Sequence, residues 1–171
     1  NRVSVVSDIY ESRHLTVKAE VYDFDSRKIW ERSAELDVPG ETNVDAFAIP
    51  FETLALDRPH FIKLRLLDAG SEIATTFYWR SNSAYEGAKT VTGPCVSGFE
   101  SLAELPKTSV VMRRDGNRIT LENAGGRIAF FVEVQFYKDG KRCVPVHYSD
   151  NFVFLLPGET VTIEVADRPE D

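Results

Sequence analysis

The chain has few of the residue patterns that identify other protein classes. Its only two cysteines, Cys95 and Cys143, form no CxxC pair, so neither a disulfide framework nor a zinc site is indicated. No apolar run approaches the roughly 20 residues needed to cross a bilayer. The net charge of -7 argues against nucleic acid, whose binding needs clustered lysine and arginine. We expect unpaired thiols and no membrane or nucleic-acid partner.

The composition is that of a folded protein. With 43% hydrophobic residues, 10 glycines and 8 prolines, the chain is neither disordered nor of low complexity. Its 171 residues allow one large domain or two smaller ones of about 80 residues. Because it begins at Asn1 rather than Met and no signal sequence precedes that residue, we expect a fragment of a longer protein.

Alternation of apolar and polar residues dominates the first half. Leu15, Val17, Ala19 and Val21 are expected on one face of a strand, with polar residues between them. Turn-like segments rich in Asp, Gly and Pro separate six strand candidates, a spacing typical of an immunoglobulin-like sandwich. These candidates are residues 3–10, 15–24, 29–38, 44–49, 60–67 and 72–80.

The alternation fails after residue 81 and resumes at residue 107. Ser97 followed by Glu100 predicts a capping box that opens one helical turn, which Pro106 ends. The later strand candidates are residues 107–113, 118–122, 127–137, 141–147, 151–156 and 160–165, and the long alternation at 127–137 predicts a central strand. We therefore predict an all-β chain of two immunoglobulin-like β-sandwiches in tandem, residues 1–82 and 107–171, joined by an irregular linker at 83–106.

Tight turns support this reading. Asp139-Gly140 predicts a type I′ hairpin, and Pro157-Gly158 predicts a type II turn before the strand that contains Val161, Ile163 and Val165. The same letters, Pro-Gly-Glu-Thr, recur at residues 39–42, which suggests that one architecture occurs twice.

Several short blocks along the whole chain are distinctive when they are taken together. The most specific block runs from Ser149-Asp150-Asn151 to Pro157-Gly158-Glu159, and the others are residues 3–10, 77–79, 102–106 and 129–132. In this order, the blocks resemble the C-terminal part of glycoside hydrolase family 2 enzymes, in the exo-β-glucosaminidase and β-mannosidase branch. The resemblance implies non-catalytic accessory domains that support a (β/α)8 barrel in the same polypeptide, and it favours a periplasmic or extracellular parent.

Catalysis by this chain is not expected. In the family that it resembles, two glutamates on the barrel perform retaining hydrolysis, and the acid/base glutamate follows an asparagine. No Asn-Glu dipeptide occurs here, and a barrel needs about 250 residues. The three histidines, His14, His60 and His147, have no metal or triad spacing, and no phosphate-binding loop is present, so we expect no catalytic residue, metal or cofactor.

The best site candidates are Trp79, Tyr148, Asp150 and Asn151, together with Tyr78 and His147. Aromatic rings stack on sugars, and amides and carboxylates bind hydroxyl groups, so these residues could line the substrate cleft or dock on the barrel. A structural role, with Asp150 and Asn151 bonding the backbone of a bend, is the leading interpretation. The alternative function is a free-standing carbohydrate-binding or adhesive module, with a glycan as its partner.

Overall fold

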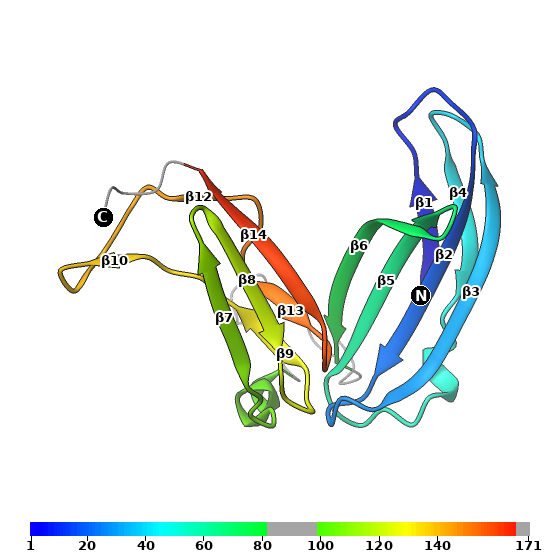
Figure 1. The fold of residues 1–171 in the computed structure, drawn as a ribbon. Helices are drawn as coiled ribbons and strands as arrows, with labels where there is room; N and C mark the ends of the chain where they lie inside the picture. The colour runs from blue at the N-terminus through cyan, green and yellow to red at the C-terminus, as the bar shows by residue number, and fades with distance from the viewer. Residues whose placement is uncertain (82–98, 167–171) are drawn as a thin grey trace, which may run out of the picture. The chain divides into compact units, whose positions relative to one another are not determined.

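The computed structural model describes residues 1–81 and 99–166 (Figure 1). This part of the chain is built from β-strands and two short 3-10 helices, with no α-helix. The chain divides into two compact units, Asn1–Leu105 and Pro106–Asp171. The predicted all-β class with two tandem sandwiches is confirmed, and each unit is described by itself below.

The first unit is an antiparallel sandwich of a four-stranded and a two-stranded sheet. The larger sheet has the order β3-β2-β5-β6, and β1 pairs with β4 in the smaller sheet. The strands are β1 (Arg2–Val6), β2 (Arg13–Tyr22), β3 (Lys28–Val38), β4 (Asn43–Ala48), β5 (His60–Asp68) and β6 (Ser71–Arg80). The 3-10 helices are η1 (Phe51–Thr53) and η2 (Glu100–Glu104).

The core of this unit lies on one face of β2. Leu15, Val17, Ala19 and Val21 are all at most 4% exposed, as their alternation predicts, and they share a buried cluster with β1 and β4 residues such as Phe47. Burying an aliphatic or aromatic side chain of this size contributes about 1.5–3 kcal/mol. The two sheets of the sandwich are therefore held together by these alternating apolar side chains.

The turn at Pro39–Thr42 differs in backbone conformation from the turn at Pro157–Thr160, which has the same four letters. In the first turn the positive φ, 53°, belongs to Glu41, whereas in the second it belongs to Gly158. Gly40 is needed because of its surroundings. A Cβ on Gly40 would lie 2.0 Å from the backbone oxygen of Tyr10, so only glycine allows this close approach. The two turns with the same four letters therefore differ in backbone conformation, although each unit is a sandwich of two sheets.

The second unit also contains a four-stranded sheet, in the order β12-β14-β8-β7. Strands β9 and β13 form a two-stranded sheet, and β10 and β11 form a hairpin. The strands are β7 (Val110–Asp115), β8 (Arg118–Asn123), β9 (Ala129–Val132), β10 (Tyr137–Lys138), β11 (Lys141–Arg142), β12 (His147–Tyr148), β13 (Val153–Leu155) and β14 (Thr160–Ala166). Ile119, Leu121, Ile163 and Val165 of the larger sheet share a buried cluster with residues of β9 and β13.

The two predicted glycine turns of this unit are present. Asp139 and Gly140 have φ values of 51° and 75°, and the pair Lys138 and Lys141 closes the hairpin, as a type I′ turn requires. Gly158 has φ 78°, and Glu159 N donates a 3.0 Å hydrogen bond to the carbonyl of Leu156. In both turns the positive φ falls where the sequence predicts it.

The prediction of one long central strand at residues 127–137 is wrong. Strand β9 covers only Ala129–Val132, and Phe131 within it adopts a left-handed φ of 57° where the register with β13 shifts. Further along, the side chain of Asn151 replaces a neighbouring strand at Val134. The candidate strand at 141–147 is also split, because Pro145 has no N–H to donate to a ladder.

Asn123 fixes the loops around the second core. It is 0% exposed, and its Nδ2 donates to the carbonyls of Arg127 at 2.7 Å and Leu155 at 2.9 Å. Its Oδ1 accepts from Thr108 Oγ1 at 2.9 Å and from the N–H of Gly125 at 3.1 Å. A buried amide that is satisfied on both ends stabilises one specific arrangement of these segments.

A helical turn is present between the two sets of strands. The 3-10 helix η2 has Phe99 as its N-cap residue and makes no side-chain capping bond, and the Ser97 of the predicted capping box lies outside the described residues. No helix within residues 1–81 or 99–166 has the length and hydrophobicity needed to span a membrane.

Candidate functional site

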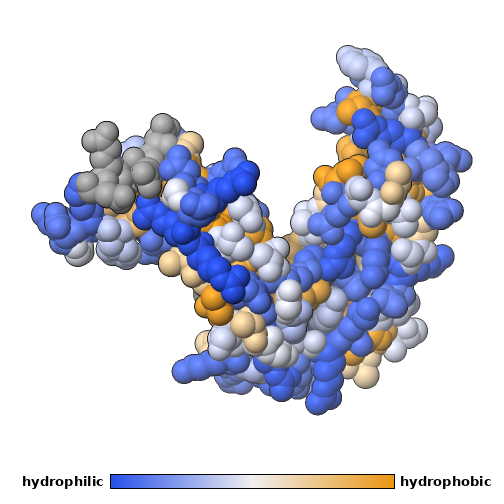
Figure 2. Space-filling view, in the orientation of Figure 1, coloured by the Kyte–Doolittle hydropathy of each residue, from blue (hydrophilic) through white to orange (hydrophobic). Residues whose placement is uncertain are grey.

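Trp79 lies on β6 of the first unit, on a strand at the edge of its sheet. Its side chain is 40% exposed, and the neighbouring Tyr78 is 52% exposed. Because successive residues of a strand point to opposite faces, the two rings cannot form one stacking platform for a sugar. Figure 2 shows that hydrophobic residues appear on the visible surface as separate small patches within a mainly hydrophilic surface.

The other three predicted site residues lie in the second unit. Tyr148 pairs with Val165 through β12 and β14, and its ring centroid is 6.1 Å from that of Phe136. Burial raises the pKa of its phenol. Tyr148 therefore contributes mainly to packing beside the second core.

Asn151 acts as a substitute strand partner. Its Oδ1 accepts hydrogen bonds from the N–H groups of Val134 at 2.8 Å and Phe152 at 2.9 Å, and its Nδ2 donates to the carbonyl of Val134 at 3.0 Å. Asp150 Oδ1 accepts the N–H of Asn151 at 2.8 Å. Both side chains therefore bond to the backbone of a bend, which is the structural role that the sequence analysis favours for Asp150 and Asn151.

This bend carries an aromatic cluster that the sequence analysis missed. Phe131 and Phe152 have ring centroids 5.0 Å apart and are 48% and 42% exposed. Phe154 meets the rings of Phe130 and Phe131 in edge arrangements, at 5.2 Å and 5.7 Å. The alternation of phenylalanines was visible in the sequence, but it predicted a regular strand and not a partly exposed cluster.

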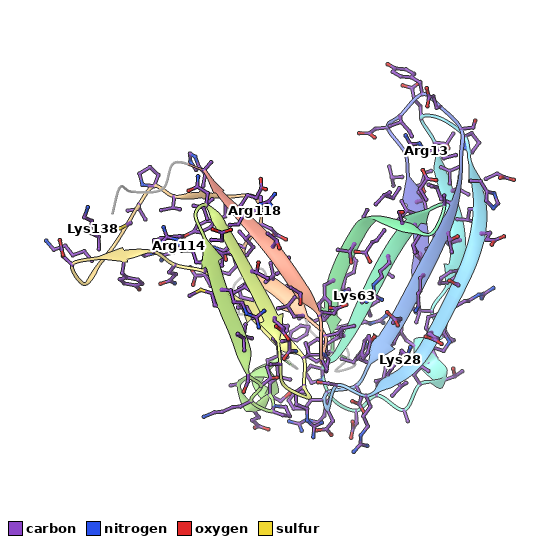
Figure 3. The ribbon with its side chains drawn as sticks, viewed as in Figure 1. Arg13, Lys28, Lys63, Arg114, Arg118 and Lys138 are labelled. Atoms are coloured by element: carbon purple, nitrogen blue, oxygen red, sulfur yellow. The ribbon has the colours of Figure 1, made fainter. Side chains whose placement is uncertain are left out.

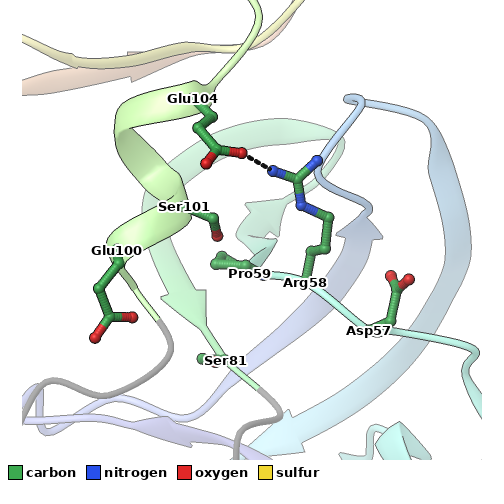
Figure 4. A pocket seen from close by; sticks show the side chains of 7 residues that line it. All are labelled: Asp57, Arg58, Pro59, Ser81, Glu100, Ser101 and Glu104. Carbon is green, nitrogen blue, oxygen red and sulfur yellow. Dashed lines mark hydrogen bonds and ion pairs between the residues drawn. The ribbon is translucent and has the colours of Figure 1, made fainter.

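The first unit has an open, charged pocket (Figure 4). The residues that line it are Asp57, Arg58, Pro59, Ser81, Glu100, Ser101 and Glu104. Arg58 Nη2 lies 2.9 Å from Glu104 Oε2, and its guanidinium lies 3.6 Å from the ring centroid of Phe24. The carboxylates of Glu100 and Glu104 point in different directions from the same helical turn (Figure 4), so they do not form a facing pair of the kind that glycosidases use.

A buried carboxylate lies on the larger sheet of the first unit. Glu20 is 4% exposed and pairs with Arg65, with Lys28 at 3.2 Å and with Lys18 at 3.4 Å. Burial alone would raise the pKa of Glu20, but Arg65 and the two lysines outweigh that effect and hold the pKa below its usual range. This ionised, fully paired group stabilises the sheet and is not available as a general acid.

Basic side chains of both units lie on several different strands (Figure 3). Several of them are paired with acidic neighbours on adjacent strands. Arg13 contacts Asp68 at 3.3 Å, and Arg118 contacts Glu164 at 3.1 Å. These ion pairs connect neighbouring strands of each sheet.

The three histidines lie on three different strands. His14 is exposed, and a 2.7 Å hydrogen bond to Asp37 raises its pKa. His60 is fully buried beside Phe51, and burial lowers its pKa. His147 lies on β12 of the other unit. Within the described ranges, no group of three or more His, Cys, Asp or Glu side chains is placed to hold a metal ion.

Two family models match the chain, one over each half. Residues 2–83 match the mannosidase Ig/CBM-like domain, and residues 90–171 match the exo-beta-D-glucosaminidase Ig-fold domain. The chain is 28% identical over 178 aligned residues to an exo-beta-D-glucosaminidase of Streptomyces avermitilis, and the alignment covers 92% of this chain and 20% of that protein. An exo-beta-D-glucosaminidase of Amycolatopsis orientalis is also 28% identical, over 177 residues, with 92% and 17% coverage. The chain thus spans about a fifth of the length of these relatives.

Solved structures show the same fold. The exo-chitosanase CsxA of Amycolatopsis orientalis superposes with a TM-score of 0.76 at 23% identity, over 96% of this chain and 22% of that one. The beta-D-mannosidase of Dictyoglomus thermophilum gives 0.64 at 17% identity, over 98% and 18%. These structures show the fold, whereas the two family models and the glucosaminidase relatives identify the chain as a pair of immunoglobulin-like domains of a glycoside hydrolase family 2 enzyme, in the exo-β-glucosaminidase and β-mannosidase branch.

Proposed function

We propose that the chain is the non-catalytic accessory part of an exo-acting β-glucosaminidase or β-mannosidase, where it supports a catalytic (β/α)8 barrel of the same polypeptide. The observation that carries this proposal is the coverage. The matched region accounts for 92% of this chain but only 20% and 17% of the two glucosaminidases, so in those proteins the equivalent domains are a small part of a longer polypeptide.

The electrostatics of the first unit agree with a role outside catalysis. A general acid in a glycosidase needs a raised pKa. Hydrogen bonding by Lys28 lowers the pKa of Glu31, and hydrogen bonding by Ser4 lowers that of Asp45. Glu20 is shifted in the same direction. These carboxyl groups are tuned to stay ionised, which suits ion pairs and not proton donation.

The test compares the full-length polypeptide with a version that lacks these two units. We expect the full-length protein to release 4-nitrophenol from an aryl β-glucosaminide or β-mannoside, and the shortened protein to unfold at a lower temperature and lose activity with it. A full-length polypeptide that hydrolyses neither glycoside, or a shortened one of unchanged stability and activity, contradicts the proposal.

A carbohydrate-binding module is the second candidate, favoured by the exposure of Tyr78 and Trp79. Their positions on opposite faces of β6 weaken it, since a sugar-binding platform needs rings on one face. Calorimetric titration with chitosan oligomers, mannan and N-glycans decides the question. Binding that Trp79→Ala abolishes supports the module, and the absence of heat with all three ligands refutes it.

A further inference from the structure

The Phe131 and Phe152 rings form the most unusual surface feature of the second unit. Each belongs to a different segment, β9 and the bend before β13, yet the rings are in contact and both remain more than 40% exposed. The edge contacts of Phe154 support Phe131 from within the same small sheet. We call these two residues the aromatic pair.

Both residues of the aromatic pair also have an unusual backbone conformation. Phe131 and Phe152 have φ values of 57° and 56°, in the left-handed region that bulky side chains rarely adopt. Asn151 holds the second of them, because its Oδ1 accepts the N–H of Phe152 while the same side chain is bonded twice to Val134. Strained backbone persists only where the surrounding structure holds it in place, and it clusters at functional positions of proteins.

The chemistry around the aromatic pair favours an apolar protein surface over a sugar. A saccharide site needs polar groups that bind hydroxyls beside the rings. Asn151 uses its oxygen and its amide nitrogen within the chain, and one oxygen of Asp150 already accepts the N–H of Asn151. These two polar neighbours are therefore engaged in shaping the bend.

We propose that the aromatic pair is a docking surface for the remainder of the same polypeptide, in particular its catalytic domain. This inference rests on the proposed function. The occupant follows from length, since about four fifths of each matched glucosaminidase lies outside the region that this chain covers. Two adjacent rings that are each more than 40% exposed fit an apolar contact in the centre of an interface.

Hydroxyl-radical footprinting of the full-length polypeptide, read by mass spectrometry, tests the surface. In the isolated 171-residue chain, Phe131 and Phe152 are expected to oxidise at rates comparable to Tyr137, which is 60% exposed on the β10–β11 hairpin. In the full-length protein the two phenylalanines should be protected at least fivefold, while Tyr137 keeps its rate. Equal oxidation of all three residues in the full-length protein overturns the docking surface.

Matched variants and conditions separate the remaining outcomes. Phe152→Asn keeps a residue that tolerates left-handed backbone, removes the ring, and should expose Phe131 in the full-length protein, whereas Tyr137→Asn should not. Protection that appears only with chitosan oligomers, or only as protein concentration rises, overturns the proposed occupant in favour of a glycan or a second copy. Glycosidase assays of the same samples test the proposed function independently. If Phe131 and Phe152 are protected but the full-length protein hydrolyses no glycoside, the proposed function is refuted. If the protein hydrolyses a glycoside but the two phenylalanines are not protected, the docking surface is refuted.

Discussion

Replacing the buried Asn123 by leucine should destabilise the second unit and leave the first one intact. The substitution keeps a side chain of related shape but removes four hydrogen bonds, two donated to the carbonyls of Arg127 and Leu155 and two accepted from Thr108 and Gly125. The four former partners then need new ones. The position is fully buried, so water cannot enter without opening the loops.

The expected loss follows from the bond count. A protein hydrogen bond contributes about 0.5–1.5 kcal/mol net, so four of them amount to about 4 kcal/mol. Gly125 and Arg127 are only partly buried and can recover water, which reduces the expected loss to about 3 kcal/mol. At about 0.05–0.15 kcal/mol per residue, a unit the size of Pro106–Asp171 has only about 3–10 kcal/mol of stability.

The chain carries its own control for this measurement. Both tryptophans, Trp30 and Trp79, lie in the first unit, so tryptophan fluorescence in urea reports on that unit alone. Amide hydrogen exchange at Leu121 of β8 and Ile163 of β14, two strands that pair with each other, reports on the second unit. Asn123→Leu should accelerate exchange at these amides by about 100-fold, the equivalent of about 3 kcal/mol, without moving the fluorescence midpoint.

The exposed Asn117, in the β7–β8 turn, provides the matched variant. Asn117→Ala should change stability by less than about 0.5 kcal/mol. If Asn123→Leu left the exchange rates of Leu121 and Ile163 unchanged, the hydrogen bonds of Asn123 would not hold the second unit together, and the reasoning would be wrong.

Three further predictions concern the first unit mainly. Arg65→Leu removes the arginine partner of the buried Glu20 and should lower the free energy of unfolding by about 2 kcal/mol, since Lys18 and Lys28 remain. Tryptophan fluorescence should then show a lower urea midpoint, and an unchanged midpoint counts against a stabilising role of the Glu20 ion pairs. Burial lowers the pKa of His60 below 6.5, so near that pH the unfolded chain binds more protons at His60 than the folded chain does. The free energy of unfolding should therefore fall as pH drops below about 6.5. His60→Phe should remove this pH dependence, and a dependence that persists in the variant would show that His60 does not cause it. Gly40→Ala should lower the melting temperature more than Gly158→Ala, because an added Cβ meets the Tyr10 carbonyl at 2.0 Å in the first case and open space in the second; the reverse order contradicts it.

Local patterns of the sequence predicted much of the fold. The buried face of β2 follows from the alternation of apolar and polar residues. The hairpin at Asp139-Gly140 follows because a type I′ turn needs positive φ at both central residues, which Asp and Gly accept. These predictions succeed because each depends on a few neighbouring residues. The class of fold follows from many such segments in series.

Contacts between distant residues account for what the sequence did not predict. The strand expected at residues 127–137 ends at Val132, and beyond it the side chain of Asn151, 17 positions from Val134, bonds the Val134 backbone in place of a neighbouring strand. The role of Gly40 depends on Tyr10, 30 positions earlier. The aromatic pair was missed for the same reason, since its two rings meet only after the bend at Asp150 has formed.

The most direct test of the account is an activity assay on the purified 171-residue chain alone. We predict no release of 4-nitrophenol above buffer from 4-nitrophenyl β-D-glucosaminide or β-D-mannoside, in a sample whose circular dichroism shows folded β-structure. Turnover that co-purifies with the chain and disappears when one of its own carboxylates, such as Glu104, is changed to glutamine would show that these sandwiches carry chemistry of their own.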